Sequence, residues 1–342
     1  MSQSIIQFSM RNKLMVFLFT ATVAALGVFS LTRIPIGATP DVTNNQVQVI
    51  TTSRNLSTLD VEKFLTYPVE MEMANLPGVQ EIRSVSKFGL SVVTIVFDES
   101  MGTYLPRQLI AEKIESASEK IPEGFGKPFM GPVTTGLGEI YQYTLEVKPE
   151  YKGRYSTMEL RSIQDWMVRR QLSGIDGVVE VNTWGGYLKQ YEVAVDPSLL
   201  KALDVTLEQV YQAVSDNNSV AGGSYIERSG QSYFVRGEGL VENLNDVRNI
   251  VVEKRGGNPV LVKDVAEVRF GHANRFGAIT GNGEGEKVMG QVMMLKGANQ
   301  NAVIERVKER VAEVQETLPE GVYINPFLDR SELISRTTST IA

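Results

Sequence analysis

Cysteine is absent from the 342-residue sequence, and histidine occurs only once, at His272. The lack of cysteine excludes disulfide bonds, thiolate metal sites and cysteine nucleophiles. A lone histidine is most often a packing or surface residue, because metal sites need clustered ligands. A metal site in this chain would therefore be built from carboxylate oxygens or methionine sulfurs.

Motifs for nucleotides and hydrolysis are also missing: there is no phosphate-binding loop, dinucleotide fingerprint or nucleophile elbow. Residues 281–285 are glycine-rich, but they precede a predicted strand and indicate a turn. The net charge is −6, whereas affinity for nucleic acid comes from clustered Lys and Arg. We therefore predict no enzyme activity, no cofactor and no nucleic-acid partner.

Only one long apolar run is present, at residues 14–31, and it carries no charge. A helix of that length spans about 27 Å, enough to cross a hydrocarbon core. Arg11 and Lys13 precede the run, which places the N-terminus in the cytoplasm. A cleaved signal peptide is the alternative. An uncleaved anchor is favoured, because the run is long and no clear small-x-small cleavage site follows it.

The remaining residues contain an internal repeat, in which 57–82 align with 156–181 at a constant offset of 99. Each copy begins with Ser-Thr, a helix cap, continues with an apolar stripe of helical period, and ends at a glycine before a β-rich run. Predicted strands at 47–52 and 140–147 precede the two copies. A strand at 90–97 and a helix at 104–120 follow the first copy, an order typical of a ferredoxin-like α+β sandwich.

The second copy is predicted to be interrupted. A Pro-Glu-Gly sequence closes the 104–120 helix and recurs at 319–321, after a predicted strand at 288–295 and a helix at 302–317. Residues 187–276 would then form an inserted α+β domain, with a hairpin turn at Ser229-Gly230. A competing alignment that joins Asp98 to Asp196 needs no insertion. It is disfavoured because no Pro-Glu-Gly follows the next helix.

Several motifs occur in a fixed order along the chain: Arg33-Ile34-Pro35-Ile36, residues 40–44, Thr66-Tyr67-Pro68, residues 131–141, 160–166, 222–228 and 264–268, and Asp329-Arg330-Ser331. Together they resemble the heavy-metal efflux branch of the resistance–nodulation–division (RND) superfamily. The resemblance covers essentially the whole sequence. The family's pumps are roughly a thousand residues long, so the resemblance implies an N-terminal fragment.

The resemblance also implies a domain organisation. Residues 1–32 would be an N-terminal segment with the first transmembrane helix, and 33–135 the first ferredoxin-like βαββαβ porter subdomain. Residues 136–186 and 277–328 would form the second porter subdomain, and 187–276 a docking domain. Residues 329–342 would begin the helix leading to the second transmembrane helix.

The implied function is that of a secondary active transporter in the bacterial inner membrane, with most of this segment in the periplasm. Such pumps are proton-driven homotrimers that work with a periplasmic adaptor (membrane fusion protein) and an outer-membrane channel. Their substrates are metal ions, and their proton relay lies in membrane helices beyond residue 342. The alternatives are a drug-type RND pump and a membrane-anchored periplasmic binding or interaction protein.

Resemblance to zinc and cobalt pumps nominates Glu139 and Asp165 as metal ligands of a periplasmic cleft. The plainer interpretation is a carboxylate at a strand end and a charge on a helix surface. Copper and silver pumps tend to carry an aromatic residue at the position of Glu139, so divalent Zn, Co, Cd or Ni is favoured over Cu or Ag. Five methionines could instead pass Cu(I), although packing explains them more simply: Met71, Met73, Met289, Met293 and Met294.

Overall fold

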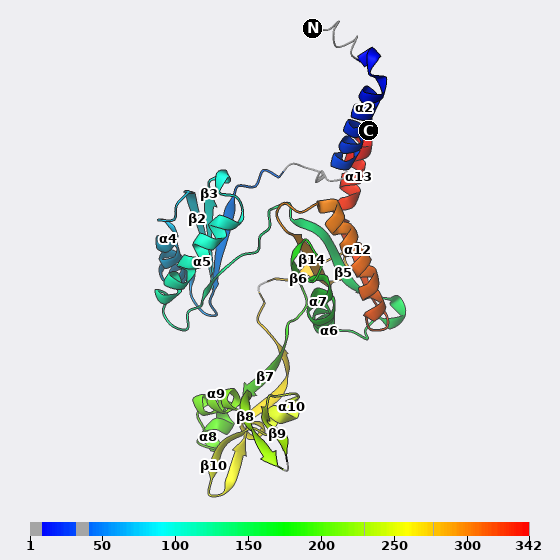
Figure 1. Ribbon diagram of the computed structural model, residues 1–342. Coiled ribbons are helices and arrows are strands. Elements are labelled where there is room, and N and C mark those ends of the chain that lie inside the picture. The colour runs from blue at the N-terminus through cyan, green and yellow to red at the C-terminus, as the bar shows by residue number, and fades with distance from the viewer. Residues whose placement is uncertain (1–8, 32–40, 229, 276, 342) are drawn as a thin grey trace.

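The computed structural model describes residues 9–31, 41–228, 230–275 and 277–341. The predicted motif at Arg33-Ile34-Pro35-Ile36, the turn residue Ser229 and the boundary residue Phe276 lie outside these ranges. Figure 1 shows an isolated helix at one end of the molecule and three bodies of mixed α/β structure.

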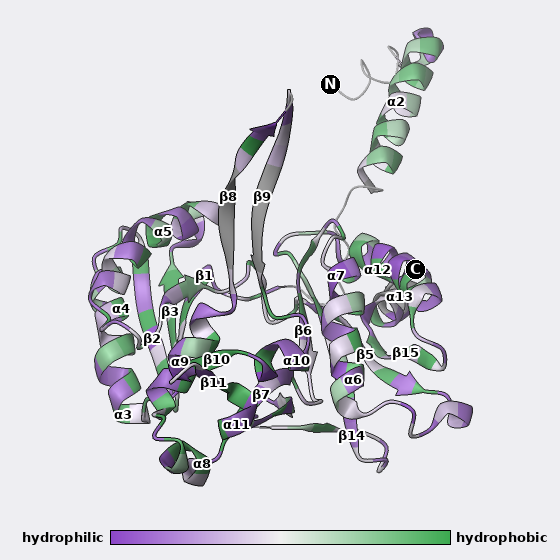
Figure 2. Ribbon diagram, turned by 90° about the horizontal axis from the view of Figure 1, so that it is seen from below, coloured by the Kyte–Doolittle hydropathy of each residue, from purple (hydrophilic) through white to green (hydrophobic). Residues whose placement is uncertain are grey.

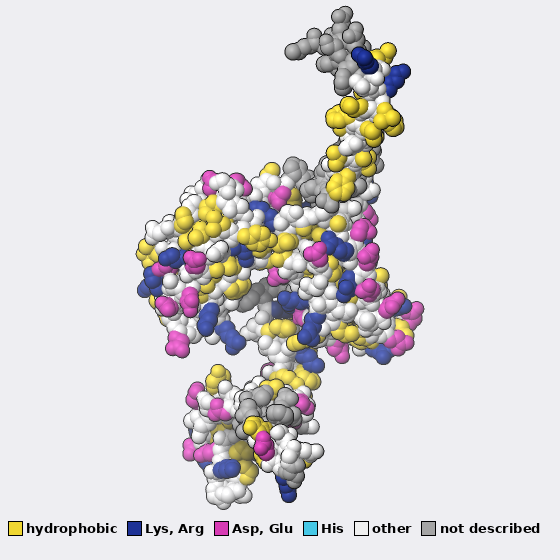
Figure 3. Space-filling model, viewed as in Figure 1, with side chains coloured by type: hydrophobic (Ala, Val, Ile, Leu, Met, Phe, Trp, Pro, Cys, Tyr) yellow, Lys and Arg dark blue, Asp and Glu magenta, His cyan; other side chains and the backbone are white. Residues whose placement is uncertain are grey.

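The isolated helix is α2 (Lys13–Leu31). Its sequence is apolar on all sides, and none of the residues in its 18-residue apolar window is buried by the rest of the chain. Figure 2 colours most of this helix as hydrophobic, and Figure 3 shows hydrophobic side chains along its length. Among the described residues, α2 is the one helix that is long and apolar enough to cross a membrane.

The first body is a four-stranded antiparallel sheet with helices on one face. Its strands lie in the order β2-β3-β1-β4. Its elements are β1 (Gln46–Thr52), α3 (Thr58–Val61), the π-helical turn η1 (Glu62–Thr66), α4 (Tyr67–Met73), β2 (Val79–Lys87), β3 (Leu90–Phe97), η2 (Glu99–Met101), α5 (Tyr104–Glu119) and β4 (Pro128–Met130). Alternate residues of β1 are buried, and Val49, Leu65, Ile95 and Ile110 form the core with the helices.

The second body repeats this arrangement. Strands β6, β14, β5 and β15 lie side by side, and the short strand β13 pairs with the other end of β14. The elements are β5 (Glu139–Val147), η3 (Pro149–Tyr151), α6 (Thr157–Ile163), the π-helical turn η4 (Gln164–Val168), α7 (Arg169–Leu172), β6 (Val178–Trp184), β13 (Ile279–Thr280), β14 (Glu286–Met294), α12 (Gln300–Thr317) and β15 (Val322–Asp329). Helix α13 (Arg330–Ile341) follows.

The third body lies between β6 and β13 in the sequence. Its elements are β7 (Lys189–Val195), α8 (Pro197–Ala202), α9 (Leu207–Asp216), β8 (Ser219–Arg228), β9 (Gln231–Gly239), α10 (Leu244–Arg248), β10 (Val251–Arg255), β11 (Asn258–Leu261), α11 (Val262–Val265) and β12 (Ala266–His272). In the described parts of the chain, its strands pair with one another, as β7-β12, β8-β9 and β10-β11. The alternative alignment through Asp196 does not describe the structure, because α8 belongs to this body and not to the second sheet.

One feature differs from the sequence prediction. The sequence predicted one helix of regular 3.6-residue period in each repeat, with Thr66-Tyr67-Pro68 of the first resembling a kinked-helix motif; a π-helical turn lies within both helices, at η1 and η4. Each turn holds a buried polar side chain that bonds to the sheet beneath it. The Thr66 hydroxyl lies 2.8 Å from the hydroxyls of Ser86 and Ser91, and Gln164 accepts a hydrogen bond from the Tyr143 hydroxyl at 3.0 Å. A π turn admits one extra residue, which changes the phase of the helix and lets these groups face inward.

The helix of the second repeat begins with a capping box at Ser156. Its hydroxyl accepts a hydrogen bond from the Glu159 backbone N–H, and the Glu159 carboxylate accepts from the Ser156 N–H at 2.8 Å. We expect Ser156→Ala to lower the free energy of unfolding by about 1 kcal/mol. Chemical denaturation measures this, with Ser173→Ala as control, since the Ser173 hydroxyl only donates to a carbonyl one turn earlier. Equal effects of the two substitutions would contradict the capping role.

Candidate cation site on the second sheet

Side chains of strand β5 lie on both faces of the second sheet. Tyr143 and Leu145 are buried beneath the helices, and the Tyr143 hydroxyl donates to Gln164 of η4. Burial raises the pKa of Tyr143, so its hydroxyl stays a neutral donor. Because successive side chains of a strand point to opposite sides, the intervening residues face away from the helices. We call this side the open face; it carries Gln142, Thr144 and Glu146 of β5, Lys287 and Met289 of β14, and Asn325 and Phe327 of β15.

Glu139 is the first residue of β5, and a register irregularity opposite Val292 and Met293 interrupts the alternation between Glu139 and Tyr141, which brings Glu139 against Gln142. The Gln142 amide donates to the Glu139 carboxylate at 3.1 Å, which places that carboxylate at the edge of the open face. Within the described part of the chain, no lysine or arginine forms an ion pair with Glu139. Its carboxylate is thus half-buried, oriented by one neutral donor, and available to a cation.

The tight turn before β5 fixes the position of Glu139. A Cβ atom on Gly138 would collide with the Thr134 hydroxyl, so this position requires glycine. The same hydroxyl donates to the Met294 carbonyl at 2.9 Å, and the Gly138 carbonyl accepts from the Met294 N–H at 2.7 Å. These bonds join the turn to β14 and hold the start of β5 in place.

Asp165 lies on the opposite side of the sheet, in η4. Its Oδ2 is 2.8 Å from Arg161 Nε, and Arg161 also donates to the Gly185 carbonyl at 2.8 Å. Only 14% of the Asp165 side chain is exposed, and its Oδ1 is buried without a hydrogen-bond partner in the described structure. The two predicted ligands therefore do not face a common point in this chain, and a metal-binding role for either stays a prediction.

The remaining predicted candidates are divided among the three bodies, with Met289, Met293 and Met294 together on β14. His272 ends β12 in the third body, where its ring lies 4.5 Å from that of Tyr187. Met73 is fully buried in the first core, and Met289 lies on the open face. In the described ranges, no three His, Asp or Glu side chains form a cluster able to hold a metal ion.

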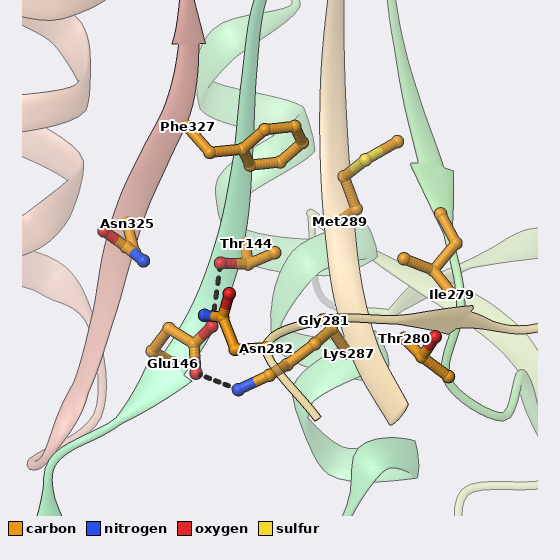
Figure 4. Close-up of a pocket in the computed structure, with 10 residues that line it drawn as sticks. All are labelled: Thr144, Glu146, Ile279, Thr280, Gly281, Asn282, Lys287, Met289, Asn325 and Phe327. Atoms are coloured by element: carbon orange, nitrogen blue, oxygen red, sulfur yellow. Dashed lines mark hydrogen bonds and ion pairs between the residues drawn. The ribbon is translucent and has the colours of Figure 1, made fainter. Parts of the chain in front are cut away.

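A cavity of about 240 Å³ opens on the open face, some distance along β5 from Glu139 (Figure 4). Ile279, Met289 and Phe327 form its apolar walls. Lys287 Nζ lies 2.7 Å from Glu146 Oε2 and 2.8 Å from Glu284 Oε2. Hydrogen bonds to these two carboxylates raise the pKa of Lys287, so it remains an ammonium.

The sequence analysis did not single out this cavity. Lys287 and Glu146 are 141 positions apart, and nothing local links them. The sequence did offer one indication of this ion pair: Lys287 directly precedes the predicted strand at 288–295. A lysine that a strand carries into a partly buried position needs a carboxylate partner.

Solved structures with the same fold are found among efflux pumps. A crystal structure of a heavy metal efflux pump (crystal form II) superposes with a TM-score of 0.89 at 36% identity, covering 98% of this chain and 33% of that chain. Crystal form I gives a TM-score of 0.87 at 33% identity. The fold is therefore that of an efflux transporter. The chain belongs to the AcrB/AcrD/AcrF family, whose model matches residues 5–342.

Curated relatives agree with this assignment. The chain is 43% identical to the cobalt-zinc-cadmium resistance protein CzcA of Cupriavidus metallidurans, over 100% of this chain and 32% of that protein. It is 38% identical to the nickel-cobalt-cadmium resistance protein NccA of Alcaligenes xylosoxydans xylosoxydans, and 34% identical to the cation efflux system protein CusA of Escherichia coli. The predicted resemblance to heavy-metal RND proteins is confirmed. The chain spans about a third of the length of these relatives.

Proposed function

We propose that this chain is the N-terminal part of a proton-driven pump that exports divalent heavy-metal cations, with Glu139 as one ligand on their path. The observation that carries the proposal is the position of Glu139. Its carboxylate lies at the edge of the open face, is oriented by Gln142, and forms no ion pair with a described lysine or arginine. Divalent ions such as Zn²⁺ accept carboxylate oxygens.

Zinc, cobalt, cadmium or nickel is favoured over copper or silver. The relatives at 43% and 38% identity are named for resistance to cobalt, zinc, cadmium and nickel. A soft ion would need several thioethers at one point. Instead, Met73 is enclosed in the first core, and Met289 lies on a different sheet.

The parts of the chain have natural roles in such a pump. Helix α2 would be the first transmembrane helix, with the three bodies in the periplasm. The first and second bodies (33–135, and 136–186 with 277–328) would be ferredoxin-like porter subdomains, and their shared strand order supports this. The inserted body (187–276) would be the docking domain, and residues 329–342 would lead to the second membrane helix. The working pump would be a homotrimer with an adaptor and an outer-membrane channel.

The test is metal-dependent growth. Cells that lack the full-length gene should tolerate less Zn, Co, Cd or Ni than cells that carry it, with unchanged tolerance to Cu and Ag. Organic drugs form the comparison arm: protection against drugs and not metals would favour the drug-type alternative. Equal growth of both strains on every metal would refute the proposal.

A further inference from the structure

Lys287 is a cation enclosed on the surface that the proposed function assigns to metal ions. Only 11% of its side chain and 15% of the Glu146 side chain is exposed. Its ammonium contacts one oxygen of Glu146 and one of Glu284, while the Thr144 hydroxyl donates to the other Glu146 oxygen at 2.9 Å. Glu146, Glu284 and Lys287 together carry a single net negative charge, and Lys152 also acts on Glu284 electrostatically. Both oxygens of Glu146 are therefore occupied, one by Lys287 and one by Thr144, and a passing cation finds no vacant carboxylate there.

Without the ammonium, the same groups would suit a divalent cation. The oxygens of Glu146 and Glu284 converge on one point, because both contact the same nitrogen. Asn282 and Asn325 line the cavity and carry amide oxygens. Carboxylate and amide oxygens are ligands that divalent ions accept. The apolar walls would strengthen their attraction to a bound cation.

Tight capture at this point would work against transport, because a conducted ion must bind weakly enough to leave. We propose that Lys287 is a built-in counter-ion that keeps Glu146 and Glu284 from trapping the exported divalent cation. Lys287 is thereby a specificity-determining residue of the open face, and this role rests on the proposed function. Lysine suits the task, because it supplies a compact point charge on a flexible stem.

The experiment titrates Zn²⁺ into the purified full-length protein by calorimetry and compares Lys287→Gln with the unmodified protein. We expect Lys287→Gln to bind one additional zinc ion per chain and to release zinc more slowly during export from loaded cells. The double variant Glu146→Gln/Lys287→Gln should lose the additional ion. Lys287→Arg, which keeps the positive charge, should also bind no additional ion.

Three results would overturn the proposal: no additional zinc in Lys287→Gln, additional zinc that persists in the double variant, or the same gain in Lys287→Arg. Lys287→Met provides a second neutral variant if Lys287→Gln does not fold. If neither Lys287→Gln nor Lys287→Met folds, but the double variant Glu146→Gln/Lys287→Gln does, the ion pair between Lys287 and Glu146 has only a structural role. If the unmodified protein exports no metal, the proposed function fails, while the zinc stoichiometries still decide whether Lys287 blocks a cation site.

Discussion

Full-length protein carrying Glu139→Gln is expected to bind Zn²⁺ at least about tenfold more weakly than the unmodified protein, and cells that depend on it should lose zinc tolerance. The substitution keeps the shape of the side chain and its contact with Gln142, but it removes the negative charge. Stability should barely change, because Glu139 forms no ion pair within the described residues. Calorimetric zinc titration, growth on zinc and thermal unfolding measure the three effects.

Asp165→Asn is the matched comparison, since both residues were nominated by the same resemblance. Asp165 pairs with Arg161 at 2.8 Å and is mostly buried, so its neutralisation leaves the Arg161 guanidinium with the Gly185 carbonyl but without a carboxylate to balance its charge. We expect Asp165→Asn to lower the stability and leave zinc affinity nearly unchanged. If Asp165→Asn weakened zinc binding and Glu139→Gln did not, the metal ligand would lie on the helix side of the sheet, and the role proposed for Glu139 would be wrong.

A second large effect is expected from Gly290→Val in the middle of β14. A Cβ atom at this position would overlap the ring and hydroxyl of Tyr143, which is fully buried. The ring would have to move, and the hydrogen bond from Tyr143 to Gln164 would break. Together these changes should cost about 3–5 kcal/mol of unfolding free energy.

Gly136→Ala is the control for this prediction, because a Cβ at Gly136 meets no atom within 4 Å. Its effect should stay within about 0.5 kcal/mol. Tyr143→Leu should partly relieve Gly290→Val, so that the double variant loses less stability than the sum of the single variants. Additive losses would show that the clash with Tyr143 is not the cause.

Much of the architecture could be predicted from local patterns. The strand predicted at 90–97 is β3 with the same bounds, and the helix predicted at 302–317 lies within α12 (Gln300–Thr317). The repeat at an offset of 99 also indicated two bodies of equal element order. These predictions succeeded because cap residues, terminal glycines and hydrophobic period act over a few residues.

The candidate site was predictable only in part. Glu139 could be nominated from its motif, but the motif did not reveal which side of the sheet the carboxylate faces. Asp165 follows Arg161 by four residues, a spacing at which helix side chains meet, so this ion pair was open to prediction, whereas the π-helical turn η4 was not. A period of 3.6 residues cannot anticipate that turn, because it accommodates a polar contact with a strand elsewhere in the chain.

The amino-acid sequence by itself determined the apolar helix, the duplicated units and the absence of cysteine, since these depend on composition and short-range order. The tertiary structure alone decided that Glu139 and Asp165 lie on opposite sides of one sheet. It also decided that Lys287 lies between Glu146 and Glu284. The physical reason is strand pairing, which brings β5 and β14 together although the inserted body lies between them in the sequence. The alternation of side chains along the paired strands then determines which charged groups meet.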